Sequence, residues 1–276
     1  MPKVITVINM KGGVGKTTLA VNISYLLSAL YKKKVLVVDI DPQFNATQYL
    51  VEQPKILDHF KNKKTIYDIL IPSKEDDISL SSKRQSVKPK PSVLDDFIIP
   101  ARKFSHSQLD LIPSSLKLIN FETNKRGTEN LLSKFIEEKC TQYDYVIIDC
   151  PPTLSLLTLS AYLASQYYLI PIKPDYLSSL GLPLLDRGLS EYEETHGHKL
   201  KLLGIVFTMV NHQANVSKEI MKEIQDSGWD CFKHSSSHST MVAQSVKSLQ
   251  DFYNYAKFAR YASEFREITK ELLTKL

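Results

Sequence analysis

A phosphate-binding loop is the clearest chemistry near the start of the chain. Its residues stand between a short apolar run and a segment with helical spacing; they are Lys11, Gly12, Gly13, Val14, Gly15, Lys16, Thr17 and Thr18. Glycines let a backbone turn tightly and bring its N–H groups against phosphate oxygens, and the start of a helix adds a positive dipole end. The Lys16 ammonium is placed to neutralise the β- and γ-phosphates, and the Thr17 hydroxyl suits Mg²⁺. The loop therefore predicts that the chain binds ATP with Mg²⁺.

The loop departs from the usual Gly-x-x-x-x-Gly-Lys-Ser/Thr pattern at one position. Met10 stands where that pattern has its first glycine, and a second lysine, Lys11, follows it. A lysine at the mouth of the loop is placed to reach phosphates that a facing subunit binds. Lys11 is therefore a catalytic candidate beside Lys16, and it predicts a dimer that forms with ATP.

Carboxylates end two of the expected strands. Asp39 and Asp41 follow the apolar run that starts at Val35, and Asp149 ends the run 145–149. Ligands of parallel sheets bind at the carboxyl ends of the strands, where a carboxylate holds Mg²⁺ or orients the attacking water. We expect Asp149 on the metal with Thr17, and we expect Asp39 and Asp41 to hold Mg²⁺ through water or to orient the attacking water. A solvated strand–loop junction is the alternative for Asp39 and Asp41.

Strands and helices alternate along the chain. Runs rich in Val and Ile predict buried strands at 4–8, 35–40, 145–149, 167–172 and 202–210, and helical spacing occurs at 17–31, 125–139, 154–166 and 216–227. This alternation predicts an α/β fold of one domain, residues 1–276: a mostly parallel, twisted sheet with helices on both faces. Residues 251–276 predict one long helix, and residues 73–104 a polar insertion.

The composition is that of a soluble globular protein, with 43% hydrophobic and 24% charged residues. No apolar run is long enough to span a membrane, and we expect a cytoplasmic protein. The three cysteines lack Cys-x-x-Cys spacing, and His234 and His238 lack an evident third ligand, so neither a zinc site nor a disulfide framework is indicated. The net charge of +5 permits an anionic partner without requiring one.

Five segments in this order resemble the ParA/Soj partition ATPases, which have a deviant phosphate loop. The segments read KGGVGKTT, VLVVDIDPQFNAT, LDLIPSS, YDYVIIDCPPTLSLLTLSA and LIPIKPDYLSSLGL. The resemblance runs from about residue 3 to residue 230, and the insertion is its main departure. It implies a P-loop fold and an ATP hydrolase.

The resemblance also implies roles for single residues and for partners. The lysine that matches Lys11 crosses the dimer interface, the aspartate that matches Asp41 is needed for hydrolysis, and Asn211 resembles a base-contacting position. The ATP-bound homodimer of the family binds DNA non-specifically and partitions plasmid or chromosomal DNA. A ParB-like partner stimulates hydrolysis, and we expect nucleoid association with no membrane partner.

Some family features are missing, and other functions stay open. The usual Pro-Arg segment is replaced by residues 231–238, and no helix-turn-helix is expected before the first strand. One alternative is a positioning ATPase with a protein cargo, and another is a MinD-like switch on a membrane surface. A metabolic or ligase-type ATPase would need a second substrate site, and no residues for one are evident.

Basic residues near the C-terminus are the candidates for contacts with DNA phosphates. They are Lys247, Lys257, Arg260, Arg266 and Lys270. A normal solvated face is the alternative, because acidic residues are interspersed among them. A second basic cluster lies in the insertion and could contact DNA or form only a soluble loop. It contains Lys83, Arg84, Lys88 and Lys90.

Overall fold

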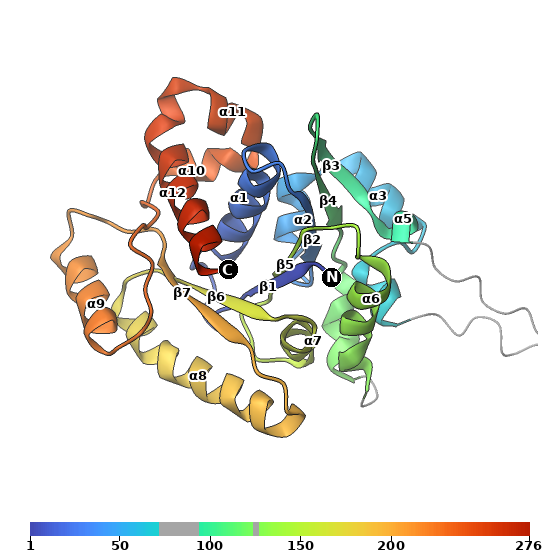
Figure 1. Ribbon diagram of the computed structural model, residues 1–276, viewed down its shortest axis with the longest axis horizontal. Helices are drawn as coiled ribbons and strands as arrows, with labels where there is room; N and C mark the ends of the chain where they lie inside the picture. Colours follow the sequence, from blue (N-terminus) through green and yellow to red (C-terminus); the bar gives the residue numbers. More distant parts are fainter. Residues whose placement is uncertain (72–93, 124–126) are drawn as a thin grey trace, which may run out of the picture.

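One seven-stranded sheet organises the computed structural model, which describes residues 1–71, 94–123 and 127–276 (Figure 1). The strand order is β3-β4-β2-β5-β1-β6-β7. β3 is antiparallel to β4, and the other pairs of neighbours are parallel. The strands are β1 Lys3–Val7, β2 Lys34–Asp39, β3 Ile99–Lys103, β4 Gln108–Ile112, β5 Tyr145–Asp149, β6 Tyr167–Ile172 and β7 Lys201–Phe207. The predicted fold class is confirmed.

Helices cover both faces of the sheet, as Figure 1 shows. Successive residues of a strand point to opposite faces, so Val4 packs in one core cluster and Ile5 in another. The first face carries α1 Lys16–Ala29, α2 Asn45–Leu50, α3 Gln53–Lys61, α11 Leu249–Asn254 and α12 Ala259–Lys275. The second carries α4 Ile66–Leu70, α6 Leu131–Lys139, α7 Leu156–Ala164, α8 Tyr176–His196 and α9 Asn215–Asp226. Burial on both sides explains why the strands read as continuous apolar runs.

Short elements complete the described chain. They are α5 Leu94–Phe97, α10 Thr240–Ala243, and the 3-10 turns η1 Leu116–Thr123, η2 Thr128–Asn130, η3 Gln244–Val246 and η4 Ala256–Phe258. Among the described residues, no helix has the length and apolar character to cross a membrane.

The C-terminal region differs from the prediction of one helix over 251–276, which is wrong. Tyr255 has an extended backbone (φ −88°, ψ 134°) and separates α11 from η4 and α12. The break lets Phe252 and Phe258 face each other in the core, with ring centroids 5.4 Å apart. The apolar spacing from Phe258 onward does describe α12.

The C-terminal end of the expected insertion 73–104 lies among the described residues. Residues 94–103 form α5 and the edge strand β3, whose register against β4 shifts between Pro100 and Arg102. An edge strand tolerates a proline because one side of its backbone needs no partner. Residues 73–93, with Lys83, Arg84, Lys88 and Lys90, lie outside the described residues.

The register of the central strands brings the expected site residues to one edge of the sheet. Asp39 at the end of β2 lies opposite Asp149 at the end of β5, and Val7 of β1 lies on the other side of Asp149. The chain leaves β1 directly into the phosphate loop, so the loop and both carboxylates share the carboxyl edge.

Candidate nucleotide-binding site

The phosphate loop has a backbone that glycine makes possible. Gly13 and Gly15 have φ of 70° and 82°, in the left-handed region, and Gly15 is the residue before α1. Thr208, just after β7, donates a 2.6 Å hydrogen bond to the carbonyl of Val14. The Lys16 ammonium donates to the carbonyl of Lys11 at 3.0 Å, across the mouth of the loop. The conformation of the loop is therefore fixed by one hydrogen bond within the loop and by another from the residue after β7.

Lys16 is buried, with 7% of its surface exposed to solvent. The protonation of its ammonium therefore depends on neighbouring groups. Burial lowers the pKa of Lys16, and the charges of Asp149 and Asp41 act in the opposite direction. A buried ammonium beside carboxylates is stabilised further by phosphate oxygens, which the cleft around it can hold.

Thr17 and Asp149 form the part of the site that fits Mg²⁺. The Thr17 hydroxyl donates to Asp149 Oδ2 at 2.7 Å, and the other carboxylate oxygen, Oδ1, has no hydrogen-bond partner among the described residues although it is buried. Burial raises the pKa of Asp149 well above its usual value, and the charge of Asp39 adds to this. An oxygen set with an unsatisfied carboxylate at the foot of a phosphate loop suits a hard divalent cation.

Asp39 is turned toward protein donors. It accepts from the Thr47 amide at 2.8 Å, from the Thr47 hydroxyl at 2.7 Å and from the Asp41 amide at 3.1 Å. Burial raises the pKa of Asp39, and these hydrogen bonds oppose that shift. In this arrangement Asp39 fixes the loop after β2 and the start of α2, and its role as a metal ligand stays a prediction.

Asp41 faces the cleft from the loop that Asp39 fixes. Its Oδ1 accepts from the Gln43 amide at 2.9 Å, and its backbone carbonyl accepts from the Ser114 hydroxyl at 2.6 Å. The Gln43 contact is local to the loop, and the Ser114 contact ties the loop to the residues after β4, so the carboxylate is held beside the phosphate loop at 6% exposure.

Two hollows open beside the loop and adjoin at Gly15, Thr18 and Met209. The phosphate cleft, of about 450 Å³, is lined by Lys16, Thr17, Asp41, Gln43, Tyr49 and Pro152, among others. The apolar hollow, of about 200 Å³, is lined by Leu19, Thr208, Ser236, Ser237, Val242 and Phe265, among others. The charged residues of the phosphate cleft suit the phosphates of a nucleotide, and the adjoining apolar hollow suits its base.

Met209 and Asn211 follow β7, and Met209 lies at this junction. Met209 has φ 51°, a left-handed backbone that is strained for a residue with a side chain and that occurs often at functional sites. Asn211 is exposed, its side-chain oxygen accepts from the Gln213 amide at 3.1 Å, and it is not among the lining residues of either hollow. Its contact with the base stays a prediction.

Lys11 is held by residues that the sequence did not single out. Its ammonium lies 2.5 Å from Asp175 Oδ1 and 3.4 Å from the Ser178 hydroxyl. Asp175 caps the N-terminus of α8 by accepting from the Ser178 amide. Burial acts to raise the pKa of Asp175, but the hydrogen bonds from Lys11 and Ser178 and the charge of Lys11 together outweigh it, and the pKa is lowered. An aspartate directly before a helical segment was the signal that could have identified this contact.

The basic candidates for DNA contact are not equivalent. Lys247, Lys257, Arg260 and Lys270 are exposed, and Lys247 directly follows Val246, which lines the phosphate cleft. Arg266 instead is only partly exposed and packs against Tyr253. It donates to the Tyr253 carbonyl at 3.0 Å, and its guanidinium lies 5.5 Å from the centre of the Tyr253 ring.

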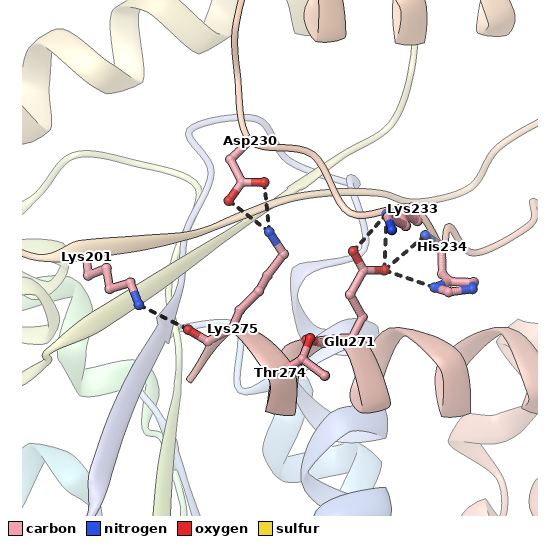
Figure 2. Close-up of polar contacts among 7 residues, drawn as sticks. All are labelled: Lys201, Asp230, Lys233, His234, Glu271, Thr274 and Lys275. Atoms are coloured by element: carbon pink, nitrogen blue, oxygen red, sulfur yellow. Dashed lines mark hydrogen bonds and ion pairs between the residues drawn. The ribbon is translucent and has the colours of Figure 1, made fainter.

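The C-terminal end of α12 is joined to residues 230–234, as Figure 2 shows. Lys275 binds both oxygens of Asp230, at 2.7 and 2.8 Å, and its carbonyl accepts from Lys201 at 3.1 Å. Glu271 accepts from the imidazole of His234 at 2.9 Å. His234 thus serves the packing of α12, and among the described residues no group of three or more His, Cys, Asp or Glu is placed to hold a metal.

A strand, a glycine loop with Lys16 and Thr17, a helix and a facing strand-end aspartate define the class of P-loop ATPases. Comparisons with known proteins agree. The AAA_31 family, described as an AAA domain, matches residues 2–202. The sporulation initiation inhibitor protein Soj of Bacillus subtilis is 33% identical over 229 residues, which is 82% of this chain and 79% of that protein. The chromosome-partitioning ATPase Soj of Treponema pallidum is 32% identical over 224 residues, or 81% and 78% of the two chains.

Solved structures have the same architecture. A plasmid partition protein from Borrelia burgdorferi B31, bound to AMPPNP, aligns over 100% of both chains with a TM-score of 0.78 and 27% identity. McdA from Cyanothece, without nucleotide, aligns over 99% of this chain and 100% of its own with a TM-score of 0.75; at 21% identity it supports the fold alone. The chain belongs to the AAA_31 family and, within it, to the Soj and ParA partition ATPases.

Proposed function

We propose that the chain is a Mg²⁺-dependent ATPase switch that closes into an ATP-sandwiched homodimer and holds DNA for partition. The observation that carries the proposal is that the two lysines of the phosphate loop have different environments. Lys16 stays inside its own loop, whereas the Lys11 ammonium lies outside it on Asp175 and remains partly exposed. An exposed cation at the mouth of a phosphate site is suited to phosphates that a second subunit presents.

ATP occupies both hollows in this proposal. Its phosphates lie in the phosphate cleft against the loop amides and Lys16, and its adenine lies in the apolar hollow. Thr17 and Asp149 hold Mg²⁺, which neutralises charge on the phosphate oxygens when bound. The AMPPNP-bound partition protein of Borrelia burgdorferi supports this choice of nucleotide.

Hydrolysis is assigned to Asp41. Its carboxylate lines the phosphate cleft and is held by contacts within its own loop, so it is positioned to orient the attacking water. Removal of the Asp41 carboxylate affects turnover more than binding, because ATP keeps its contacts with Lys16 and the loop amides. A ParB-like partner accelerates this step.

Binding of DNA is assigned to exposed cations of the C-terminal region, above all Lys247, Lys257 and Arg260. Lys247 directly follows Val246, a lining residue of the phosphate cleft, and this neighbourhood in the chain supports Lys247 as a candidate. The dimer presents each cation twice to one duplex, so dimer formation strengthens a contact that depends on phosphate neutralisation. The chromosome-partitioning role named for the Treponema pallidum relative and the plasmid partition role named for the Borrelia burgdorferi structure support DNA as the cargo.

The experiment is DNA binding in three nucleotide states. Filter binding with a random and a defined duplex is measured with ATP, with ADP and without nucleotide, and sedimentation under the same conditions reports the dimer. We expect DNA binding and dimer formation with ATP and Mg²⁺ alone, with equal affinity for both duplexes. Equal binding in all three states contradicts the switch, and a dimer that binds no DNA favours a protein cargo.

A further inference from the structure

Residues 231–238 run beside β7 as an irregular edge of the sheet. Two isolated parallel bridges, Ile205 to Cys231 and Val210 to Ser237, replace a regular strand. The amides of Phe232, Ser236 and His238 donate inward to carbonyls of β7 and the residues after it, at 2.8, 2.9 and 3.0 Å. The end of this segment, with Ser236 and Ser237, forms one wall of the apolar hollow.

Two carboxylates of α12 satisfy outward-facing amides of the segment. Glu264 accepts from the Ser237 amide at 2.8 Å and from the Ser237 hydroxyl at 2.5 Å. Glu271 accepts from the Lys233 amide at 2.9 Å and from the His234 amide at 3.3 Å (Figure 2). The two glutamates are seven residues apart, about two helical turns, so they lie on one face of α12. The outer edge of a sheet otherwise leaves such amides to solvent.

Glu264 acts on the wall of the hollow, and Glu271 acts at the far end of the segment. Ser237, which Glu264 holds, lines the hollow, and so does Phe265, the residue after Glu264. Lys233 and His234, which Glu271 holds, do not line it. A carboxylate that accepts from an amide and a hydroxyl makes charge-assisted bonds, which are stronger than bonds between neutral groups. Glu264 therefore sets the distance between the serine wall and Phe265.

We propose that Glu264 is a positioning residue for the nucleotide base. It touches no nucleotide itself, and it holds Ser237 at the spacing that a flat aromatic base fills against the apolar side of the hollow. This proposal rests on the proposed placement of adenine in the apolar hollow. It assigns support of one wall of the hollow to a contact between α12 and residues 231–238.

The test separates the base from the phosphates. Calorimetric titrations with Mg²⁺ use ATP and inorganic tripolyphosphate, which has the phosphates without base or sugar. We expect Glu264→Ala to raise the Kd for ATP about tenfold, the equivalent of one lost hydrogen bond to a charged group. The Kd for tripolyphosphate should stay at the wild-type value, because the loop is untouched.

Two further variants serve as controls. Glu264→Gln keeps a side chain that can accept from the Ser237 amide, so it should recover most of the ATP affinity. Glu271→Ala removes the same kind of contact from the far end of the segment and should leave both Kd values unchanged. Equal losses for ATP and tripolyphosphate in Glu264→Ala indicate general loosening and overturn the proposal, and so does an unchanged Kd for ATP. If the wild-type protein binds ATP no more tightly than tripolyphosphate, the placement of the base is wrong and the positioning role falls with it.

Discussion

The Lys11 ammonium lies 2.5 Å from the Asp175 carboxylate, a contact between residues 164 positions apart in the chain. The contact connects the mouth of the phosphate loop to the N-cap residue of α8. Both side chains are about one-third exposed, so the pair exchanges with solvent at modest cost. A facing subunit that brings phosphates to Lys11 therefore competes with Asp175 for the same cation.

Removal of the Lys11 charge should separate dimer formation from nucleotide binding. In Lys11→Ala we expect ATP binding near the wild-type affinity, because Lys16 and the loop amides remain, and loss of the ATP-dependent dimer. Sedimentation with ATP and Mg²⁺ measures the dimer. Asp175→Asn is the matched variant: it keeps a helix-capping side chain but frees Lys11, so the dimer should form at a lower ATP concentration. An intact dimer in Lys11→Ala would show that Lys11 does not cross the interface.

Lys16 should carry most of the affinity for the phosphates. It is buried inside the loop, where its ammonium has few competing contacts and only the Lys11 carbonyl as a described hydrogen-bond acceptor. Lys16→Ala should weaken ATP binding by roughly 100-fold, the equivalent of a strong charge-assisted contact. Calorimetry measures the change, and Lys11→Ala is the control with equal charge removed. Unchanged affinity in Lys16→Ala is incompatible with a phosphate loop.

Asp41 should matter for turnover rather than binding. The loss of a residue that orients water costs about 100-fold in rate or more, whereas ATP keeps its contacts with the loop. We expect Asp41→Ala to bind ATP and to accumulate as the ATP-bound dimer. Phosphate release under single-turnover conditions gives the rate, and sedimentation gives the dimer. A variant that hydrolyses ATP at the wild-type rate would move the role of Asp41 to another carboxylate.

Asn22 connects the nucleotide site to the C-terminal helices and should be critical for stability. It is fully buried on α1, donates to the Thr18 carbonyl at 2.8 Å and to the Tyr49 hydroxyl at 3.3 Å, and accepts from the Tyr253 hydroxyl at 2.7 Å. Asn22→Ala leaves buried hydroxyls with fewer partners and should lower the free energy of unfolding by about 2–3 kcal/mol. Urea denaturation measures it. The exposed Asn254→Ala should change the free energy by less than about 0.5 kcal/mol; similar values for both variants would argue against the network.

The phosphate loop and the strand-end carboxylates were predictable because they depend on local order. A strand, a glycine turn and a helix follow one another directly, and the alternation of buried strands predicts a parallel sheet that brings Asp39 and Asp149 to one edge. The family and the ATP hydrolase that the resemblance implied are confirmed by the comparisons. The roles of the individual site residues stay predictions.

Contacts between distant segments could not be predicted from local patterns. The pairs Lys11–Asp175 and Ser237–Glu264 form only after the sheet places β1, β6 and β7 side by side and α12 returns across them. The break at Tyr255 has the same origin, since the helical spacing continues on both sides and packing of Phe252 against Phe258 decides where the helix ends. The sequence predicts Arg266 as an exposed cation, but its guanidinium donates a hydrogen bond to the Tyr253 carbonyl.

Salt dependence should reveal which cations contact DNA. If each subunit offers about three phosphate contacts, a dimer neutralises roughly six, and log K should fall against log salt with a slope near −5. Lys257 in η4 and Arg260 at the start of α12 are exposed, away from the phosphate loop in the chain. Their joint replacement by alanine should reduce the slope by about two to four units if both subunits use both residues.

The control for this variant removes the same charge elsewhere. Lys134 and Lys139 lie on α6, which covers the opposite face of the sheet from α12 (Figure 1). Their joint replacement by alanine should leave the slope at its wild-type value, and neither double variant should alter ATP turnover without DNA. Filter binding over a salt series provides the slopes. Equal reductions of the slope in the two double variants would mean that net charge, rather than the positions of Lys257 and Arg260, determines DNA binding, and two wild-type slopes would exclude both residues as DNA contacts.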